Sequence, residues 1–449
     1  MSGIFLILLL VLAIAFIVVG TAKFHIHPFL ILLVASYGLG LFAGISPADT
    51  IEALVAGFGE TIGEIGIIIA AGTIIGVALE RTGGAQVMAD TVVRAVGKAR
   101  TVLSMSITGS VVSIPVFFDS GYVILSPLAR SLAAKSGTSM VTYALALSMG
   151  LMATHIFVPP TPGPVAAAGS LGADLGIVIL LGLVVTVPVV AVSYFYAIFM
   201  GNRYYIDPES ISVTNAPDVE SEKTGPAPSP FRAFLPILLP IVLISLNSIA
   251  TFEGSPLGEG LVYSILTFIG DPNTALLIGA FTALYVTVSG GGKSITQDAV
   301  MDALRVAGPI ILITGAGGAL GGVLQATPIT DFLANNLALS GLGLGLPFLL
   351  AAALKTAQGS STVAIVTTAS IIAPLAGSLG LESSTDLALA TLAIGSGSAV
   401  VAHANDSGFW VVTQFSGMSV SEGYKFYTTA TLIAGITGII TVLLLSLIL

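Results

Sequence analysis

The chain has 449 residues, of which 55% are hydrophobic and only 8% are charged, whereas about a quarter of the residues of a soluble domain are charged. Together with a mean hydropathy of +1.04, this composition excludes an ordinary soluble fold and predicts an all-α protein that crosses a membrane several times. The formal net charge of -9 says little about a ligand, and the absence of cysteine excludes disulfides and thiolate chemistry.

The longest apolar stretches approach or reach the roughly 18 to 20 residues that a helix needs to cross the hydrocarbon core. They are 4–19, 177–200, 234–249 and 432–449. The first stretch has no basic leader, and Lys23 follows it where a signal peptide would have a small-residue cleavage site. We therefore interpret all four as spanning helices.

The basic residues predict how the chain threads through a cell inner membrane, because Lys and Arg are retained on the cytoplasmic side. With the N-terminus outside, Lys23 and the basic segment 81–100 lie inside. The next basic residues follow without an acidic exterior loop, which predicts a re-entrant hairpin over about 101–134 that opens to the cytoplasm. The polar linker 201–230 is then cytoplasmic and the C-terminus lies outside. Only Lys355 breaks this pattern.

Three features occur twice in the chain at nearly the same separation. They are the Gly-rich segments that begin at Gly72 and Gly318, the prolines Pro127 and Pro374, and the histidines His155 and His403. We expect two repeats, 1–200 and 231–449, joined by the linker. An odd number of spans in each turns the second copy upside down, an organisation that is common among transporters.

Each repeat contains two segments that do not suit a lipid-facing helix. The first is the tip of a hairpin, which lies at 115–121 in the first repeat and at 358–362 in the second. The second hairpin spans about 343–377, and we expect it to open outwards. The second is a broken helix, with four prolines between Pro159 and Pro164, and again at 403–410. Irregular backbone at membrane depth has to be covered by protein or water, so we expect the four breaks to meet near the midplane.

These breaks carry motifs that resemble those of the gluconate permease family, and the similarity runs along nearly the whole chain. The motifs are FFDSGYVILSPLA, THIFVPPTPGP, AQGSSTVA and HANDSGFW, preceded by GFGETIGEIG and ERTGGA. The resemblance implies the inverted-repeat fold of the ion transporter superfamily and a homodimer whose transport domains move like elevators. It also implies symport with protons of gluconate, related sugar acids, D-serine or other short hydroxy acids.

A polyol carboxylate needs donors for its charge and its hydroxyls, and half-helix N-termini with free amides supply the first. The substrate-binding candidates all lie at or beside the breaks. They are Asp119, Ser120, Gly121, His155, Thr161, Gly163, Lys355, Gln358, Gly359, Ser360, Ser361, Thr362, His403, Asn405, Asp406 and Ser407. Two alternatives stay open: Lys355 could snorkel to the surface, and Asp119 and Asp406 could cap half-helices.

Proton coupling needs an ionisable group inside the membrane, and such a residue is a functional candidate by default. The candidates are Asp119, His155, His403, Asp406, Glu60 and Glu64. The histidines could instead bridge broken backbone, and the two glutamates could lie near the outer interface. Our hypothesis is that Asp119 is protonated when the substrate binds.

Other classes of protein fit less well. The chain has no HExxH, Walker or GxSxG motif, so we do not expect an enzyme. A channel would need a continuous polar stripe along a pore rather than paired breaks. A sodium-coupled carboxylate carrier of the same superfamily is the nearest rival. We expect no cofactor, metal or nucleic acid, and we expect a small organic anion, a proton and the lipid bilayer as partners.

Overall fold

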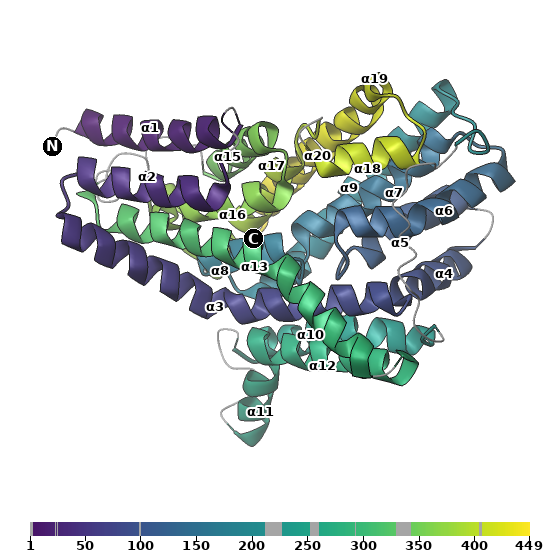
Figure 1. The fold of residues 1–449 in the computed structure, drawn as a ribbon, viewed down its shortest axis with the longest axis horizontal. Helices are drawn as coiled ribbons and strands as arrows, with labels where there is room; N and C mark the ends of the chain where they lie inside the picture. The colour runs from purple at the N-terminus through teal and green to yellow at the C-terminus, as the bar shows by residue number, and fades with distance from the viewer. Residues whose placement is uncertain are drawn as a thin grey trace.

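The computed structural model describes residues 3–22, 24, 26–97, 100–211, 227–251, 260–291, 293–328, 343–403 and 406–449. Throughout these residues the regular secondary structure is helical (Figure 1). Five of the described helical segments are long and apolar enough to cross a membrane, and two bent pairs raise the number to as many as seven. The prediction of an all-α fold is therefore confirmed for the described residues, and several of their helices are long and apolar enough to span a membrane.

The chain begins with two helices that lie side by side and continues into one long helix. These elements and the next are α1 (Gly3–Ala22), α2 (Pro28–Phe42), α3 (Pro47–Arg81) and α4 (Gly84–Val96). The long helix starts where the Ser46 hydroxyl accepts a hydrogen bond from the Asp49 amide at 3.1 Å, with Pro47 in the first turn. Proline suits this place because the first amides of a helix have no partner within it.

The next part of the chain is a helical hairpin followed by an interrupted helix. Its elements are α5 (Thr101–Val112), α6 (Phe118–Ser136), α7 (Met140–Phe157), α8 (Pro162–Leu171) and α9 (Leu175–Arg203). The hairpin formed by α5 and α6 turns at 113–117. The helix that follows is interrupted at 158–161, between α7 and α8, where the prolines have no backbone N–H to donate. Every residue of α7 is buried, so this helix lies in the middle of the protein.

A group of helices then leads to a second long helix. They are α10 (Pro230–Thr251), α11 (Leu261–Gly270), α12 (Pro272–Gly291) and α13 (Lys293–Gln325). In Figure 1, α10, α11 and α12 lie below α3, and α13 runs beside α3.

The last part again contains a hairpin and an interrupted helix. Its elements are α15 (Gly345–Gln358), α16 (Ser361–Ile372), the short turns η2 (Ala373–Leu375) and η3 (Gly377–Leu379), α17 (Ser384–Ala399), α18 (Ser407–Phe415), α19 (Val420–Gly423), the π-helical turn η4 (Tyr424–Thr428) and α20 (Thr429–Leu445). The hairpin turns at Gly359, whose φ of 84° lies in the left-handed region that glycine adopts without strain.

The two long helices α3 and α13 pack against each other in opposite directions. Near one end, a Cβ atom on Gly57 would lie 2.4 Å from the carbonyl oxygen of Gly318, so only glycine allows this approach. Near the other end, Arg81 of α3 forms an ion pair with Asp302 of α13.

The hairpins and the interrupted helices are packed across the two parts of the chain. The first arm of each hairpin packs on the first half of its own interrupted helix, α5 on α7 and α15 on α17. The second arm of each hairpin packs on the second half of the interrupted helix from the other part of the chain, so α6 contacts α18 and α16 contacts α8. This crossed arrangement brings the breaks to one place.

Candidate functional site

A cavity of about 150 Å³ lies where the breaks meet. Its walls come from the starts of α6, α16 and α18 and from one face of α7. The lining residues are Phe117, Phe118, Asp119, Met152, His155, Ser360, Ser361, Thr362, Asp406 and Ser407. The structure therefore brings together seven of the substrate-binding candidates.

Asp406 and Lys355 form a buried ion pair at the cavity wall. The Lys355 Nζ lies 2.5 Å from Asp406 Oδ2 and donates a second hydrogen bond to the Gly359 carbonyl at 2.6 Å. Lys355 is 1% exposed, so it does not snorkel to the surface. The other Asp406 oxygen accepts from the Gly408 amide at 2.9 Å and caps α18. Lys355 therefore links the second hairpin, through α15, to the start of α18 in the second interrupted helix.

Asp119 is the other carboxylate of the cavity, and it lies in the first turn of α6. Its Oδ2 accepts a hydrogen bond from the Ser407 hydroxyl at 2.6 Å, which joins the first hairpin to the second interrupted helix. The structure gives α6 no side-chain cap, so the capping alternative does not apply to Asp119. Of the two carboxylates of the cavity, Asp406 has its charge compensated by Lys355. Asp119 has no cationic side chain in contact with it among the described residues.

His155 faces the cavity from the end of α7. It is 8% exposed, and its Nδ1 has no hydrogen-bond partner within the described part of the chain. The Phe117 ring lies 6.3 Å away between ring centres. A buried polar atom without a partner is uncommon in native proteins, and here the atom belongs to a residue that lines a cavity.

Three consecutive residues at the N-terminal end of α16 present small polar groups to the cavity. Ser360 is the N-cap, and its hydroxyl accepts from the Val363 amide at 3.3 Å. The Ser361 hydroxyl donates to the Ser398 carbonyl at 2.9 Å, which ties the hairpin to the end of α17. Thr362 completes the first turn, where the helix amides have no partners within the helix.

Other candidates lie close to the cavity but do not line it. The Thr161 hydroxyl donates to the carbonyls of His155 and Val158 at 3.0 and 2.8 Å and closes the break in its own helix. A Cβ on Gly163 would lie 3.0 Å from Ile365, so this glycine lets α8 approach α16. A Cβ on Gly121 would lie 2.8 Å from the Leu151 side chain, so this glycine lets α6 approach α7.

The remaining candidates have different positions. The His403 Nε2 lies 2.8 Å from the Thr356 carbonyl, so this histidine bridges backbone beside the second hairpin. Glu60 is exposed on α3. Asn405 and the side chains of Gln358 and Glu64 lie outside the described residues.

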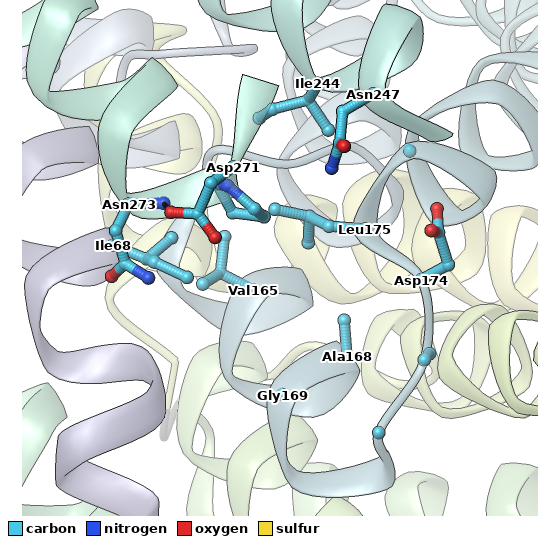
Figure 2. Close-up of a pocket in the computed structure, with 14 residues that line it drawn as sticks. Ile68, Val165, Ala168, Gly169, Asp174, Leu175, Ile244, Asn247, Asp271 and Asn273 are labelled. Carbon is cyan, nitrogen blue, oxygen red and sulfur yellow. Dashed lines mark hydrogen bonds between the residues drawn. The ribbon is translucent and has the colours of Figure 1, made fainter. Parts of the chain in front are cut away.

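Two larger cavities have a different chemical character. One, of about 350 Å³, lies between α3, α8, α9, α10 and α12, and Figure 2 shows Asp174 and Asp271 among its lining residues. Each of these carboxylates caps a helix, Asp174 at the Ile177 amide and Asp271 at the amide of Asn273. The other cavity, of about 360 Å³, lies beside Glu60 and the glycines of α13. The smaller cavity at the breaks is the candidate binding site because helix starts and ionisable groups converge there.

Sequence reasoning missed Phe117, Phe118 and Met152, which form the apolar part of the wall. The two phenylalanines stand directly before Asp119 in the motif that carried the family resemblance, and that position could have indicated them. Nothing in the sequence pattern distinguishes Met152 from the other apolar residues of the fully buried α7.

Known proteins resemble this chain along its whole length. It is 36% identical over 440 residues to a gluconate permease of Pseudomonas aeruginosa, covering 96% of this chain and 95% of that protein. It is 35% identical over 453 residues to the D-serine transporter DsdX of Escherichia coli K12, covering 99% of both. It is also 35% identical over 452 residues to the inner membrane permease YgbN of the same strain, covering 98% of this chain and 95% of that protein.

Two solved transporter structures share the fold, each with a TM-score of 0.65. The YdaH transporter of Alcanivorax borkumensis is 17% identical, and the match covers 94% of this chain and 99% of that one. MtrF of Neisseria gonorrhoeae is 15% identical, with 95% and 96% covered. A family model described as GntP family permease matches residues 5–448. The chain therefore belongs to the GntP permease family, and it is a membrane transporter rather than an enzyme.

Proposed function

We propose that this protein is a secondary active transporter that takes up gluconate or a related sugar acid together with a proton. The observation that carries the proposal is the convergence of helix N-termini on one cavity. The starts of α6, α16 and α18 line it, and the start of α8 packs beside Thr362. Free amides and the helix dipole make each start favourable for an anion, so a carboxylate is the ligand group that this cavity suits best.

The charges of the cavity support proton coupling. Lys355 compensates Asp406 at 2.5 Å, whereas Asp119 has a neutral donor, Ser407, at 2.6 Å. A monoanionic substrate would add a second uncompensated negative charge beside Asp119, and two like charges inside a protein repel strongly. A proton on Asp119 removes this repulsion, so we propose that substrate and proton bind together.

We further propose that the chain is built of two inverted repeats, 1–200 and 231–449, with the linker 201–230 in the cytoplasm and both termini outside. The order of elements supports this, since each part contains a hairpin followed by an interrupted helix. In this proposal α3 and α13 belong to a static scaffold. The hairpins and interrupted helices move as an elevator in each subunit of a homodimer in the cell inner membrane.

A short amino or hydroxy acid such as D-serine is the second candidate substrate, and the size of the cavity favours it. The cavity at the breaks, at about 150 Å³, is smaller than the two other cavities described above, at about 350 and 360 Å³, and a small cavity favours a short acid over a six-carbon one. The ammonium group of an amino acid would then have Asp119 as its partner.

Counterflow in proteoliposomes tests the substrate class directly. Vesicles loaded with unlabelled gluconate should exchange it for labelled gluconate, and D-serine and glycerate should be tested as competitors. We expect His155→Gln to weaken binding about three- to tenfold, as the loss of one hydrogen bond would. His27→Gln, at the exposed start of α2, is the control. If none of the three acids were exchanged or competed, the proposed substrate class would be wrong.

A further inference from the structure

The wall of the cavity at the breaks is made of three helix starts and one helix end. The starts of α6, α16 and α18 line it, whereas α7 contributes Met152 and His155 from its last two turns, shortly before it ends at Phe157. A helix start carries partial positive charge, and a helix end carries partial negative charge. An organic anion in this cavity therefore places its carboxylate at the three starts and turns its other end towards α7.

The two lining residues of α7 differ in what they offer to that other end. Met152 and His155 are three residues apart, so they lie on the same face of the helix. The imidazole ring of His155 can form hydrogen bonds, whereas the thioether of Met152 has no charge and is only a weak acceptor. Met152 is 3% exposed and lines the cavity. Its contribution to this wall is therefore the space that its side chain fills.

The backbone of α7 is fixed near Met152 by close contacts with two other helices. Towards α5, a Cβ on Gly150 would lie 2.2 Å from the Ser106 carbonyl oxygen. Towards α17, a Cβ on Gly395 would lie 2.5 Å from the Ile156 carbonyl oxygen. Because both contacts are between backbones, the helix has no room to shift at this height. The space at this wall of the cavity is then set by the Met152 side chain.

The two other apolar residues of the wall, Phe117 and Phe118, are held by aromatic neighbours. The Phe118 ring lies 6.4 Å from that of Tyr122 and 6.3 Å from that of Tyr427, measured between ring centres. The Phe117 ring lies 6.3 Å from that of His155. Both phenylalanines stand at the start of α6, which is a carboxylate end of the cavity, so neither limits the far end of the substrate.

We propose that Met152 determines the length of the acid that the site accepts, because its side chain is the stop for the end of the substrate opposite the carboxylate. This inference rests on the proposed function and deepens it by naming the residue that separates short acids from six-carbon acids. A shorter side chain at this position enlarges the cavity at the far end of the substrate. The site then admits gluconate more readily, while the carboxylate contacts of a three-carbon acid stay in place.

A role in packing alone is the competing explanation, since truncating any buried methionine leaves a void and destabilises the protein. Such a loss lowers the amount of active transporter and affects all substrates alike. The ratio of apparent affinities for two acids of different length does not depend on that amount. The matched control is Met140→Ala, which makes the same truncation at a fully buried position of α7, about 18 Å away along the helix.

Counterflow in proteoliposomes measures this ratio. The labelled tracer is the acid that wild type exchanges, gluconate or D-serine, and unlabelled glycerate and gluconate compete with it. Met152→Ala should move the ratio of half-inhibitory concentrations about tenfold or more towards gluconate, as expected when an apolar pocket gains room. Met152→Val should cause a smaller shift in the same direction and serves as the test if the alanine variant does not fold. Met152→Leu, which nearly conserves volume, should cause the smallest shift, and Met140→Ala should have the wild-type ratio.

Three results would contradict parts of this account, and they are distinguishable. The wild-type ratio in both Met152→Ala and Met152→Val would overturn the assignment of Met152, because that result is expected of a packing residue. A shift towards glycerate would also overturn it, since a longer cavity does not favour the shorter acid. Failure of wild type to exchange or bind gluconate, glycerate or D-serine would overturn the proposed function, and this inference with it, before any variant is compared.

Discussion

The buried pair of Lys355 and Asp406 makes the sharpest prediction about stability. The side chains are 1% and 9% exposed, and their charged atoms lie 2.5 Å apart. Replacing Lys355 with methionine leaves a buried carboxylate without its partner, and breaking such a pair costs about 3–5 kcal/mol. For a chain of this size we expect the melting temperature of Lys355→Met to fall by about 5 °C or more.

Thermal unfolding of the detergent-solubilised protein, followed by size-exclusion chromatography after heating, measures this effect. Lys135→Met is the matched control, because Lys135 is exposed at the end of α6. The double variant Lys355→Met, Asp406→Asn should recover part of the loss, since it removes both charges together. A melting temperature of Lys355→Met equal to that of the control would refute the reasoning.

Three further predictions concern coupling and packing. Asp119→Asn should retain counterflow but lose accumulation driven by a proton gradient, measured as labelled uptake with and without an imposed pH difference; retained accumulation would contradict the assignment of Asp119. Gly76→Ala should destabilise the protein by about 1–3 kcal/mol, because its Cβ would lie 2.3 Å from the backbone oxygen of Pro115. Gly59→Ala is the control and should have the wild-type melting temperature, because a Cβ at this position would have no atom within 4 Å. Ser407→Ala removes the hydrogen bond that joins Asp119 to the start of α18 and should slow gradient-driven uptake about three- to tenfold, as the loss of one hydrogen bond would; uptake equal to that of wild type would count against a role for this bond.

The sequence allowed the breaks to be located because proline and glycine act locally. The prolines from Pro159 to Pro164 coincide with the interruption between α7 and α8, and Gly359 marks the turn between α15 and α16. Hydrophobic length predicted helices such as α9, which extends from Leu175 to Arg203 and includes the expected span 177–200.

The roles of individual polar residues could not be predicted from the sequence in the same way, because they depend on which elements meet. Lys355 was conspicuous as the basic residue that breaks the charge pattern, and the structure places it inside the protein beside Asp406. Thr161 looked like a substrate contact, but its hydroxyl bonds to the backbone of its own break.

Uptake of labelled gluconate into proteoliposomes, with and without an inward proton gradient and at varied sodium concentration, tests the central claim most directly. The account predicts accumulation that the proton gradient stimulates and that does not depend on sodium, with D-serine tested in parallel as the alternative substrate. Uptake of either acid that requires sodium and ignores the proton gradient would contradict it.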